Sequence, residues 1–572
     1  MSTNVHPTVR LLEATAACCP FDVEASSDLR LALDFLGRPV APTVVIQASY
    51  VAAVAIGVAL SLLALFIPGQ FRLVVVLAGV TIGLLTTHTI QAAPQLWATA
   101  RRTSALGAAP DLVARTVLSM RLSPTPERAA DFAARTGDGI LGASLANHVR
   151  QHRHSGLSGL VAFGDAWADL FPALRRSVAL VSAAGNASGH DRERLLDRAL
   201  SVVMAGTRDQ MESFGAQVRT PVTALYAFGV LLPTALVALL PAGSAVGVAV
   251  TPLTVVAIYN VALPAVLLGA AAWLLARRPV AFPPPAVTTD QDGVPDRTGL
   301  AIALGVGAGG LVAVSASVIA PRWAAVVGAI GIGTGLGMVC YYRPVVSRYD
   351  RIRRIEAGLP DALTLISRRV ANGRAVETAI EHTGEELDDE IGAVLRAGAL
   401  RHRQLQISVE EAFLGRDGVL TDVPSPRVRG SVALLALASE EGRPAGTALL
   451  ALGDHVEDLQ AIEREARRSL AHVCQTLQTT GMLFGPLVAG ATVALAEGIG
   501  GEAFLAERTQ SLIWLGGPVG VYVLLLAVIL TALATGLTRG LDRELLGYRI
   551  GRALCSATGA YLSAYLLVGT LL

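Results

Sequence analysis

The chain of 572 residues contains no lysine, so all 46 of its basic residues are arginine. A phosphate-binding loop of the Gly-x-x-x-x-Gly-Lys-Ser/Thr type needs a lysine that contacts the phosphates. The sequence therefore excludes an ATPase motor built on such a loop. Charged residues of both signs are also scarce, at 16%, whereas soluble domains average about 25%.

Aromatic and cysteine residues are few as well. Aromatic side chains make up 5% of the chain, and the five cysteines are Cys18, Cys19, Cys340, Cys474 and Cys555. No spacing among these cysteines matches a zinc or iron–sulfur site, so the sequence predicts no metal and no other cofactor. Adjacent Cys18 and Cys19 are either ordinary thiols, which we favour, or a site of lipidation or redox chemistry. The net charge of +1 gives no reason to expect nucleic acid as a partner.

Apolar residues are abundant, at 52% of the chain. An apolar run of about 20 residues crosses lipid as a helix, because a helix pairs all of its own backbone groups. Nine such runs occur, near residues 43–66, 73–91, 221–240, 253–275, 299–320, 323–341, 479–496, 512–537 and 554–572. The N-terminal stretch lacks the layout of a cleavable signal peptide.

The distribution of arginine predicts the orientation, since short cytoplasmic loops are enriched in basic residues. With the N-terminus in the cytoplasm, the outer segments contain only Arg72, Arg322 and Arg508. We therefore expect a multi-pass protein of the cytoplasmic (cell) membrane, with both long polar stretches inside. The fold class is all-α, with about nine transmembrane helices and two cytoplasmic helical-bundle domains.

This reading divides the chain into eight segments. They are an N-terminal cytoplasmic segment (1–42), spans 1 and 2 (43–92), a first helical domain (93–220), spans 3 and 4 (221–276), a cytoplasmic linker (277–298), spans 5 and 6 (299–341), a second helical domain (342–478) and spans 7 to 9 (479–572).

The two halves repeat each other. A shift of 250 positions sets Pro110-Asp111 on Pro360-Asp361, Glu127 on Glu377 and Ala162-Phe163 on Ala412-Phe413. After about four inserted residues, Ser177 to Leu180 falls on Ser431 to Leu434. The repeated unit is two spans, a polar helical domain and two more spans, with one extra span at the end.

The second polar domain shows a helical pattern. Residues 361–370 and 376–381 each place apolar side chains on one face, and Asn372-Gly373 marks the break between these two helices. The first copy has Ser123 instead of that glycine, and prolines at 124 and 126 end the helix by another route.

Three stretches of the second copy carry a family resemblance. They read Leu359-Pro360-Asp361-Ala362-Leu363, then Asn372-Gly373-Arg374-Ala375-Val376-Glu377-Thr378-Ala379-Ile380, and then Ser439-Glu440-Glu441-Gly442 followed by Thr447-Ala448-Leu449-Leu450-Ala451-Leu452. They resemble the type II secretion system protein F family, the platform proteins of type II secretion, type IV pili and the archaellum. The first copy is degenerate at the second turn, because residues 184–189 contain no Glu-Gly pair. Two domains in one nine-span chain resemble archaeal members more than bacterial ones.

The resemblance implies a platform that catalyses no reaction. A separate hexameric ATPase would move its cytoplasmic domains, and the platform would pass that motion to pilin-like subunits in the lipid bilayer. Gly373 and Gly442 would be structural turns. A homodimer or homotrimer would match the symmetry of a hexameric partner. Whether the product is a pilus, an archaellum or a secreted protein stays open.

Candidate contacts for the partner lie at two places in the second copy. They are Glu440 and Glu441 at the second turn, and Glu463, Arg464, Arg467 and Arg468 on a helix over residues 454–475. This helix runs into the seventh span, and we hypothesise that it transmits motion because a continuous helix is a stiff connection. The alternative is a salt-bridged surface helix, in which Glu463 and Arg467 pair at a spacing of four.

Other functions and sites fit the sequence less well. The main rival is a polytopic solute transporter built from a repeated half. Transporters usually keep ionisable groups within their spans. The spans of this chain are almost entirely apolar, and their polar exceptions are His88, Asn260 and Glu497. No constellation typical of a membrane enzyme stands out. His152, His154 and His402 read as parts of a basic face rather than as metal ligands. The acidic run of residues 385–390 is either a hydrated helix face or a contact for arginines of a motor.

Overall fold

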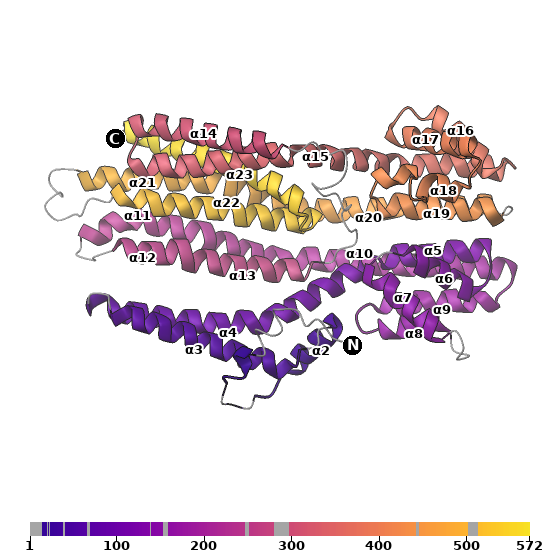
Figure 1. Cartoon of the computed structure of the whole chain (residues 1–572), viewed down its shortest axis with the longest axis horizontal. Helices are drawn as coiled ribbons and strands as arrows, with labels where there is room; N and C mark the ends of the chain where they lie inside the picture. The colour runs from indigo at the N-terminus through magenta and orange to yellow at the C-terminus, as the bar shows by residue number, and fades with distance from the viewer. Residues whose placement is uncertain are drawn as a thin grey trace. The chain divides into compact units, whose positions relative to one another are not determined.

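The computed structural model describes residues 14–571, except residues 20, 22, 38–39, 66–68, 138, 153–157, 246–250, 279–296, 442–444 and 502–512. Every regular element in this described part is a helix, as the sequence predicts. The chain divides into two compact units (Figure 1). Unit 1 contains Met1–Ser104 and Ala272–Arg278, and unit 2 contains Ala105–Ala271 and Pro279–Leu572.

Unit 1 is built from helices α2 (Ser27–Leu36) and α3 (Pro42–Leu65) and most of α4 (Gly69–Leu106). Helix α2 lies in the N-terminal segment, where no helix was predicted. The Ser26 side chain accepts a hydrogen bond from the first turn of α2, as N-cap residues do. Leu29 and Leu33 of α2 pack in one apolar cluster with Val45 of α3.

Unit 2 holds the remaining helices apart from the end of α13 (Ala272–Ala276), which belongs to unit 1, and these helices follow one another in two series. The first series is α5 (Ala109–Leu122), α6 (Pro126–Thr136), α7 (Gly139–His152), α8 (Gly159–Ala166), α9 (Pro172–Asn186), α10 (Gly189–Tyr226), η1 (Ala227–Leu231), α11 (Leu232–Ala245), α12 (Pro252–Val256), η2 (Ala257–Ala262) and α13 (Leu263–Ala276). The second series is α14 (Thr298–Ile319), α15 (Arg322–Ala371), α16 (Val376–Glu386), α17 (Glu390–Leu405), α18 (Val409–Leu414), η3 (Val419–Asp422), α19 (Pro426–Glu441), α20 (Ala445–Thr479), η4 (Thr480–Phe484), α21 (Gly485–Gly501), η5 (Ile513–Leu515), α22 (Gly516–Arg539) and α23 (Arg543–Leu571).

Eight helices in the described part are long and apolar enough to cross a membrane. They are Pro42–Ala59, Gly189–Leu240, Pro252–Ala276, Thr298–Ile319, Arg322–Ala371, Ala448–Gly498, Ile513–Arg539 and Arg543–Leu571. Each overlaps one of the spans expected from the sequence, although several boundaries differ. The remaining expected span, residues 73–91, lies within α4, whose side chains are described only in part, so the count of nine stays a prediction.

The helices recur in the same order in both halves, in agreement with the sequence repeat. Helices α6 to α10 of the first copy correspond to α16 to α20 of the second, and each series continues into a π-helix, η1 or η4. The expected breaks also occur: α5 ends at Leu122 and α6 begins at Pro126, while α15 ends at Ala371 and α16 begins at Val376.

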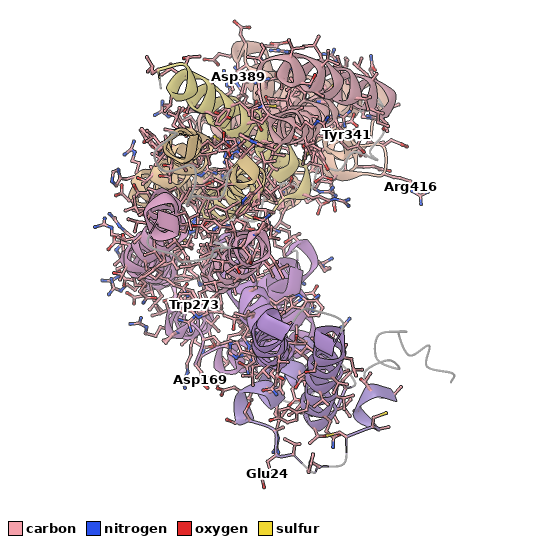
Figure 2. The ribbon with its side chains drawn as sticks, turned by 90° about the vertical axis from the view of Figure 1, so that its left-hand side faces the viewer. Glu24, Asp169, Trp273, Tyr341, Asp389 and Arg416 are labelled. Carbon is pink, nitrogen blue, oxygen red and sulfur yellow. The ribbon has the colours of Figure 1, made fainter. Side chains whose placement is uncertain are left out.

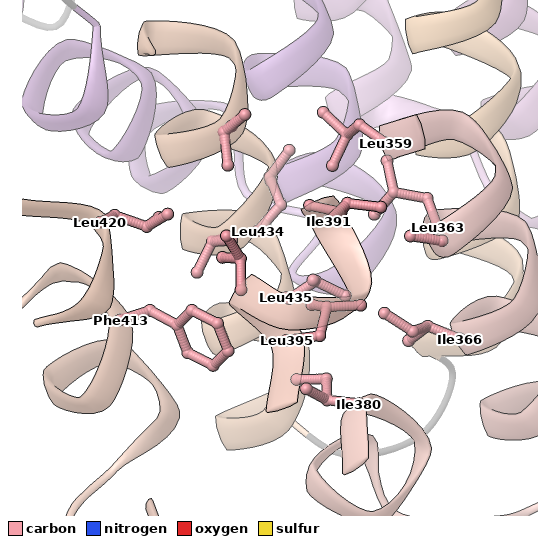
Figure 3. Packing of buried hydrophobic residues seen from close by; sticks show 14 of the residues in the cluster. Leu359, Leu363, Ile366, Ile380, Ile391, Leu395, Phe413, Leu420, Leu434 and Leu435 are labelled. Carbon is pink, nitrogen blue, oxygen red and sulfur yellow. The ribbon is translucent and has the colours of Figure 1, made fainter. Parts of the chain in front are cut away.

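A single apolar core fills the second polar region (Figure 3). Leu363 and Ile366 of α15 and Ile380 of α16 are each at most 2% exposed, which confirms the predicted apolar faces. Leu395 of α17 and Phe413 of α18 are buried in the same cluster. This core holds together the two turns that the sequence singles out.

The two copies surround a matching phenylalanine, Phe163 or Phe413, with different neighbours. A Cβ atom on Gly398 would collide with the ring of Phe413, so the glycine leaves room for that ring. In the first copy the position of Gly398 is taken by His148, whose ring lies edge-on to Phe163 with centroids 6.1 Å apart. The aromatic side chain is therefore kept in both copies, and its neighbour differs.

Gly398→Ala should destabilise the protein by about 1–3 kcal/mol, because the added methyl group overpacks the ring of Phe413. Thermal unfolding in detergent measures the loss. Adding Phe413→Leu should recover part of it, since the smaller side chain leaves space for the methyl group. Equal costs for Gly398→Ala in the two backgrounds would contradict this packing.

Proline residues interrupt two apolar helices at matching positions of the repeat. Pro233 in α11 and Pro486 in α21 have no N–H, which leaves the carbonyls four residues earlier, at Gly229 and Met482, without their helical donor. Tyr522 of α22 donates its hydroxyl hydrogen bond to the Gly229 carbonyl. Ser556 of α23 donates to the Met482 carbonyl at 3.1 Å. Later helices thus satisfy the groups that the prolines release.

The backbone just before these prolines is π-helical, a form that is frequent at functional sites. The Leu232 N–H donates to the Ala227 carbonyl, five residues back, and the Gly485 N–H donates to the Thr480 carbonyl in the same way. Each π-helix joins a long polar helix, α10 or α20, to an apolar one.

Candidate functional site

The first turn of the second copy joins α15 to α16. The Gly373 N–H donates to the Val370 carbonyl at 2.9 Å, and the Gly373 backbone has a φ of +88°. This left-handed conformation suits glycine because it has no Cβ atom. The structure places Gly373 in a left-handed conformation between α15 and α16, at the position where the sequence predicts a turn.

The end of α19 and the start of α20, which flank the second turn, lie against the first turn. The Ser439 hydroxyl donates a hydrogen bond to the carboxylate of Glu377, near the start of α16. A Cβ atom on Gly446, at the start of α20, would lie 2.7 Å from the Cα atom of Ala371. A polar bond and a close backbone approach thus bring together two motifs that are more than 60 residues apart in the chain.

In the first copy the same two turns meet through different chemistry. Gly185 occupies the position of Ser439, and a Cβ atom on it would collide with the ring of Pro126. The contact between the turns is therefore apolar, although Glu127 matches Glu377. Asn186, which matches Glu440, is exposed as Glu440 is. The first copy keeps the geometry of the turns and changes their surface.

Two continuous helices connect this pair of turns to apolar segments. Helix α15 is 50 residues long and runs from Arg322 to the first turn, and α20 runs 35 residues from the second turn to Thr479. Helix α20 packs against the polar part of α15, where Gly453 faces Thr364 and Gln460 donates to the Glu356 carbonyl (Figure 1). At a rise of 1.5 Å per residue, the 30 residues from Tyr341 to Ala371 span about 45 Å. A displacement of the turns would therefore be transmitted toward the apolar helices through α15 and α20, which are continuous and packed together.

The candidate contact residues on α20 are partly engaged within the protein. Glu463 pairs with Arg427 of α19 at 3.2 Å and with Arg467 one turn later, and its side chain is only 17% exposed. The predicted pairing of Glu463 with Arg467 is thus confirmed, and Glu463 also fastens α19 to α20. Arg464 and Arg468 are exposed.

The structure separates the two groups of candidate contacts. Glu440 is exposed at the end of α19, whereas Glu463 lies 18 residues into α20, about 27 Å from its start at 1.5 Å per residue. The side chain of Glu441 and the whole of Gly442 lie outside the described residues. Contact with a partner at any of these residues stays a prediction.

The two copies are fastened together by a buried arginine that the sequence did not single out. Arg115 of α5 is 3% exposed, pairs with Asp111 at 2.5 Å and donates to the carbonyls of Thr136 and Pro426. Leu118 of the same helix joins the apolar core of the second copy. The repeat contains a signal for the burial of Arg115, because this arginine occupies the position at which the second copy has the apolar residue Leu365.

His455 of α20 lies at the same junction. It is 5% exposed, and its Nε2 atom has no hydrogen-bond partner among the described residues. Burial lowers the pKa of His455 to about 4, the charge of Asp111 opposes this shift, and the charge of Arg427 adds to it. The imidazole is therefore neutral at pH 7.

The acidic run at residues 385–390 is largely bound within the protein. Glu386 pairs with Arg369, and Glu390 pairs with Arg351 at 3.0 Å. Asp389, labelled in Figure 2, accepts the Gly392 N–H at 2.9 Å as the N-cap of α17. These contacts favour the interpretation of a structural helix face over a contact for arginines of a motor.

Two of the three histidines considered as metal ligands form hydrogen bonds with the backbone, and the third lies outside the described residues. His152 and His402 each donate through Nδ1 to a backbone carbonyl, at 3.0 and 2.6 Å, and His154 lies outside the described residues. Within the described part, no three His, Cys, Asp or Glu side chains are grouped as metal ligands would be. All five cysteines are free thiols.

Comparison with known proteins finds no family model, no curated protein and no solved structure that matches this chain.

Proposed function

We propose that this protein is the membrane platform of a type IV pilus-like or type II-like secretion machine. In this role it couples a cytoplasmic hexameric ATPase to the assembly of pilin-like subunits. The observation that carries the proposal is the pair of turns joined by Ser439 and Glu377, from which α15 and α20 run into apolar segments. The residues at these turns are the ones that resemble the type II secretion system protein F family.

The orientation belongs to the same proposal. With the N-terminus in the cytoplasm of the cell, both polar regions face the ATPase, and few arginines lie outside. The two copies then have different tasks. The second copy offers Glu440 at an exposed turn, and the first copy supports it through Arg115. A dimer or trimer of the protein would match the symmetry of a hexameric partner.

The test is affinity purification of the tagged full chain from gently solubilised membranes, with identification of the proteins that accompany it. A secretion-type ATPase should accompany the natural protein. Glu440→Arg should reduce its recovery about tenfold, because reversing one charge at a contact costs on the order of 1.4 kcal/mol or more.

Asn186→Arg is the matched control, since it adds the same side chain to the same turn of the first copy. It should leave recovery of the ATPase unchanged. Absence of any ATPase or pilin, with the protein stable and inserted, would favour the solute transporter instead. Equal recovery with both variants would remove Glu440 from the contact.

A further inference from the structure

Four arginines from four different helices gather at one place in unit 2. They are Arg353 of α15, Arg467 of α20, Arg539 at the end of α22 and Arg549 near the start of α23. Helix α15 packs against α20 and α23, and α22 packs against α20 and α23. The charges of Arg353 and Arg467 act on Arg539, and the charge of Arg353 acts on Arg549. We call these four residues the arginine cluster.

The arginine cluster has few close ion pairs, although the charges of Asp350, Glu356 and Glu463 act on it. Among the described residues, no carboxylate lies within 4.0 Å of Arg353, Arg539 or Arg549. Arg467 shares the single carboxylate of Glu463 with Arg427. Partly buried charges of one sign are costly unless an opposite charge is brought to them. The cluster therefore has the electrostatics of an anion site.

Burial and repulsion are both evident at Arg353, which lies in the polar part of α15. Burial, followed by the charge of Arg467, lowers the pKa of Arg353, while Glu463, Asp350 and Glu356 only partly oppose the shift. Arg549 has a weak partner, since its Nη1 atom lies 3.5 Å from Thr535 Oγ1. Guanidinium donors are thus left for a ligand.

The cluster lies at the level where apolar helices give way to polar ones. Arg539 is the last residue of the apolar helix α22. Two residues before Arg549, Gly547 makes room for the ring of Tyr342, and that ring lies edge-on to the ring of Tyr341 with centroids 4.9 Å apart. Tyrosine is enriched at the boundary between lipid and water, where the phosphates of lipid headgroups lie.

We propose that the arginine cluster binds a phosphate group, and that this phosphate belongs to the headgroup of an anionic membrane lipid. Guanidinium groups bind phosphate through paired N–H donors, and a group that is always charged keeps this ability at any physiological pH. Basic residues at the membrane surface attract anionic lipids. The lipid would hold the ends of α22 and α23 against α15 and α20. This site does not depend on the secretion role.

The test uses the purified full chain in detergent, delipidated and then mixed with phosphatidylglycerol, with phosphatidylcholine or with inorganic phosphate. Phosphatidylglycerol should raise the Tm by about 3–8 °C, because a ligand that binds only the folded state stabilises it. Phosphatidylcholine should have little effect, since its choline cancels the charge of the phosphate. A rise with inorganic phosphate alone would overturn the lipid as the source.

The double variant Arg539→Gln and Arg549→Gln should lose the response to phosphatidylglycerol. The matched control is Arg416→Gln and Arg543→Gln, which removes the same charge at two exposed positions outside the cluster and should keep the response. An undiminished rise in the cluster variant, or no rise in the natural protein, would overturn the proposal.

A second measurement does not need a variant that folds. Native mass spectrometry of the natural protein, purified without added lipid, should find phosphatidylglycerol or another anionic phospholipid retained in a fixed ratio. Retention of zwitterionic and anionic lipids in proportion to their abundance in the membrane would contradict a specific phosphate site.

Discussion

Replacing Ala471 and His472 with glycine should abolish filament assembly or secretion while leaving membrane insertion intact. Both side chains are exposed on α20, so their removal takes little from the packed core. Each glycine costs a helix interior about 1 kcal/mol and makes it easier to bend. If α20 carries motion from the second turn to the apolar segments, a flexible point between them should stop the transfer. Assembly or secretion by whole cells measures the effect.

The control keeps α20 stiff at the same positions. Ala471→Gln with His472→Ala preserves helix propensity and should leave assembly unchanged. Insertion is followed by recovery of each variant in the membrane fraction. Normal assembly by the glycine variant would end the transmission hypothesis. The neighbouring Leu470 is unsuitable for the test, because it is 7% exposed and its replacement would also remove a packed side chain.

Acidification should weaken the folded state through His455. Its pKa is about 4 in the folded protein and about 6.5 in an unfolded chain, so between these values the unfolded chain binds the proton more readily. This contribution to stability is therefore complete above pH 6.5 and is lost as the pH falls toward 4. Between pH 7 and 4.5 the loss should be about 2–3 kcal/mol.

His455→Leu separates this effect from other titrations, since it keeps a buried apolar side chain and removes the ring nitrogens. The natural protein should lose about 2–3 kcal/mol more than the variant on acidification, measured by denaturant unfolding in detergent at the two pH values. At pH 7 the variant should be at least as stable, because Nε2 of His455 has no partner among the described residues. Parallel pH profiles would show that the histidine is not the cause.

Local patterns in the sequence predicted local structure well. The turn at Asn372-Gly373, the apolar faces around it and the recurrence of helices in two copies were all visible as periodicity, a glycine signal and a repeat. Boundaries between apolar and polar segments were drawn at residues 221 and 342, where the composition changes. The helices α10 and α15 nevertheless continue through these points, because a change of solvent does not end a helix.

Contacts between distant residues were not predictable in the same way. The bond between Ser439 and Glu377 joins two motifs that were both identified, but nothing in their spacing says that they meet. Arg115 was not singled out from the sequence, and its burial follows from the packing of α5 on α19 and α20. Periodicity reports which face of a helix is buried, and it does not report which helix covers it.

The carbonyl released by Pro233 has a consequence for how the protein is made. Its donor, Tyr522, is synthesised 293 residues after Gly229. An unpaired backbone group within the hydrocarbon costs several kcal/mol. Until Tyr522 is made, the Gly229 carbonyl lacks the hydroxyl donor that it has in the folded protein. By contrast, Ser556 follows Met482 by only 74 residues. The second half therefore contains the hydroxyl donor for the carbonyl released by its own proline, whereas the first half obtains its hydroxyl donor from a helix made much later.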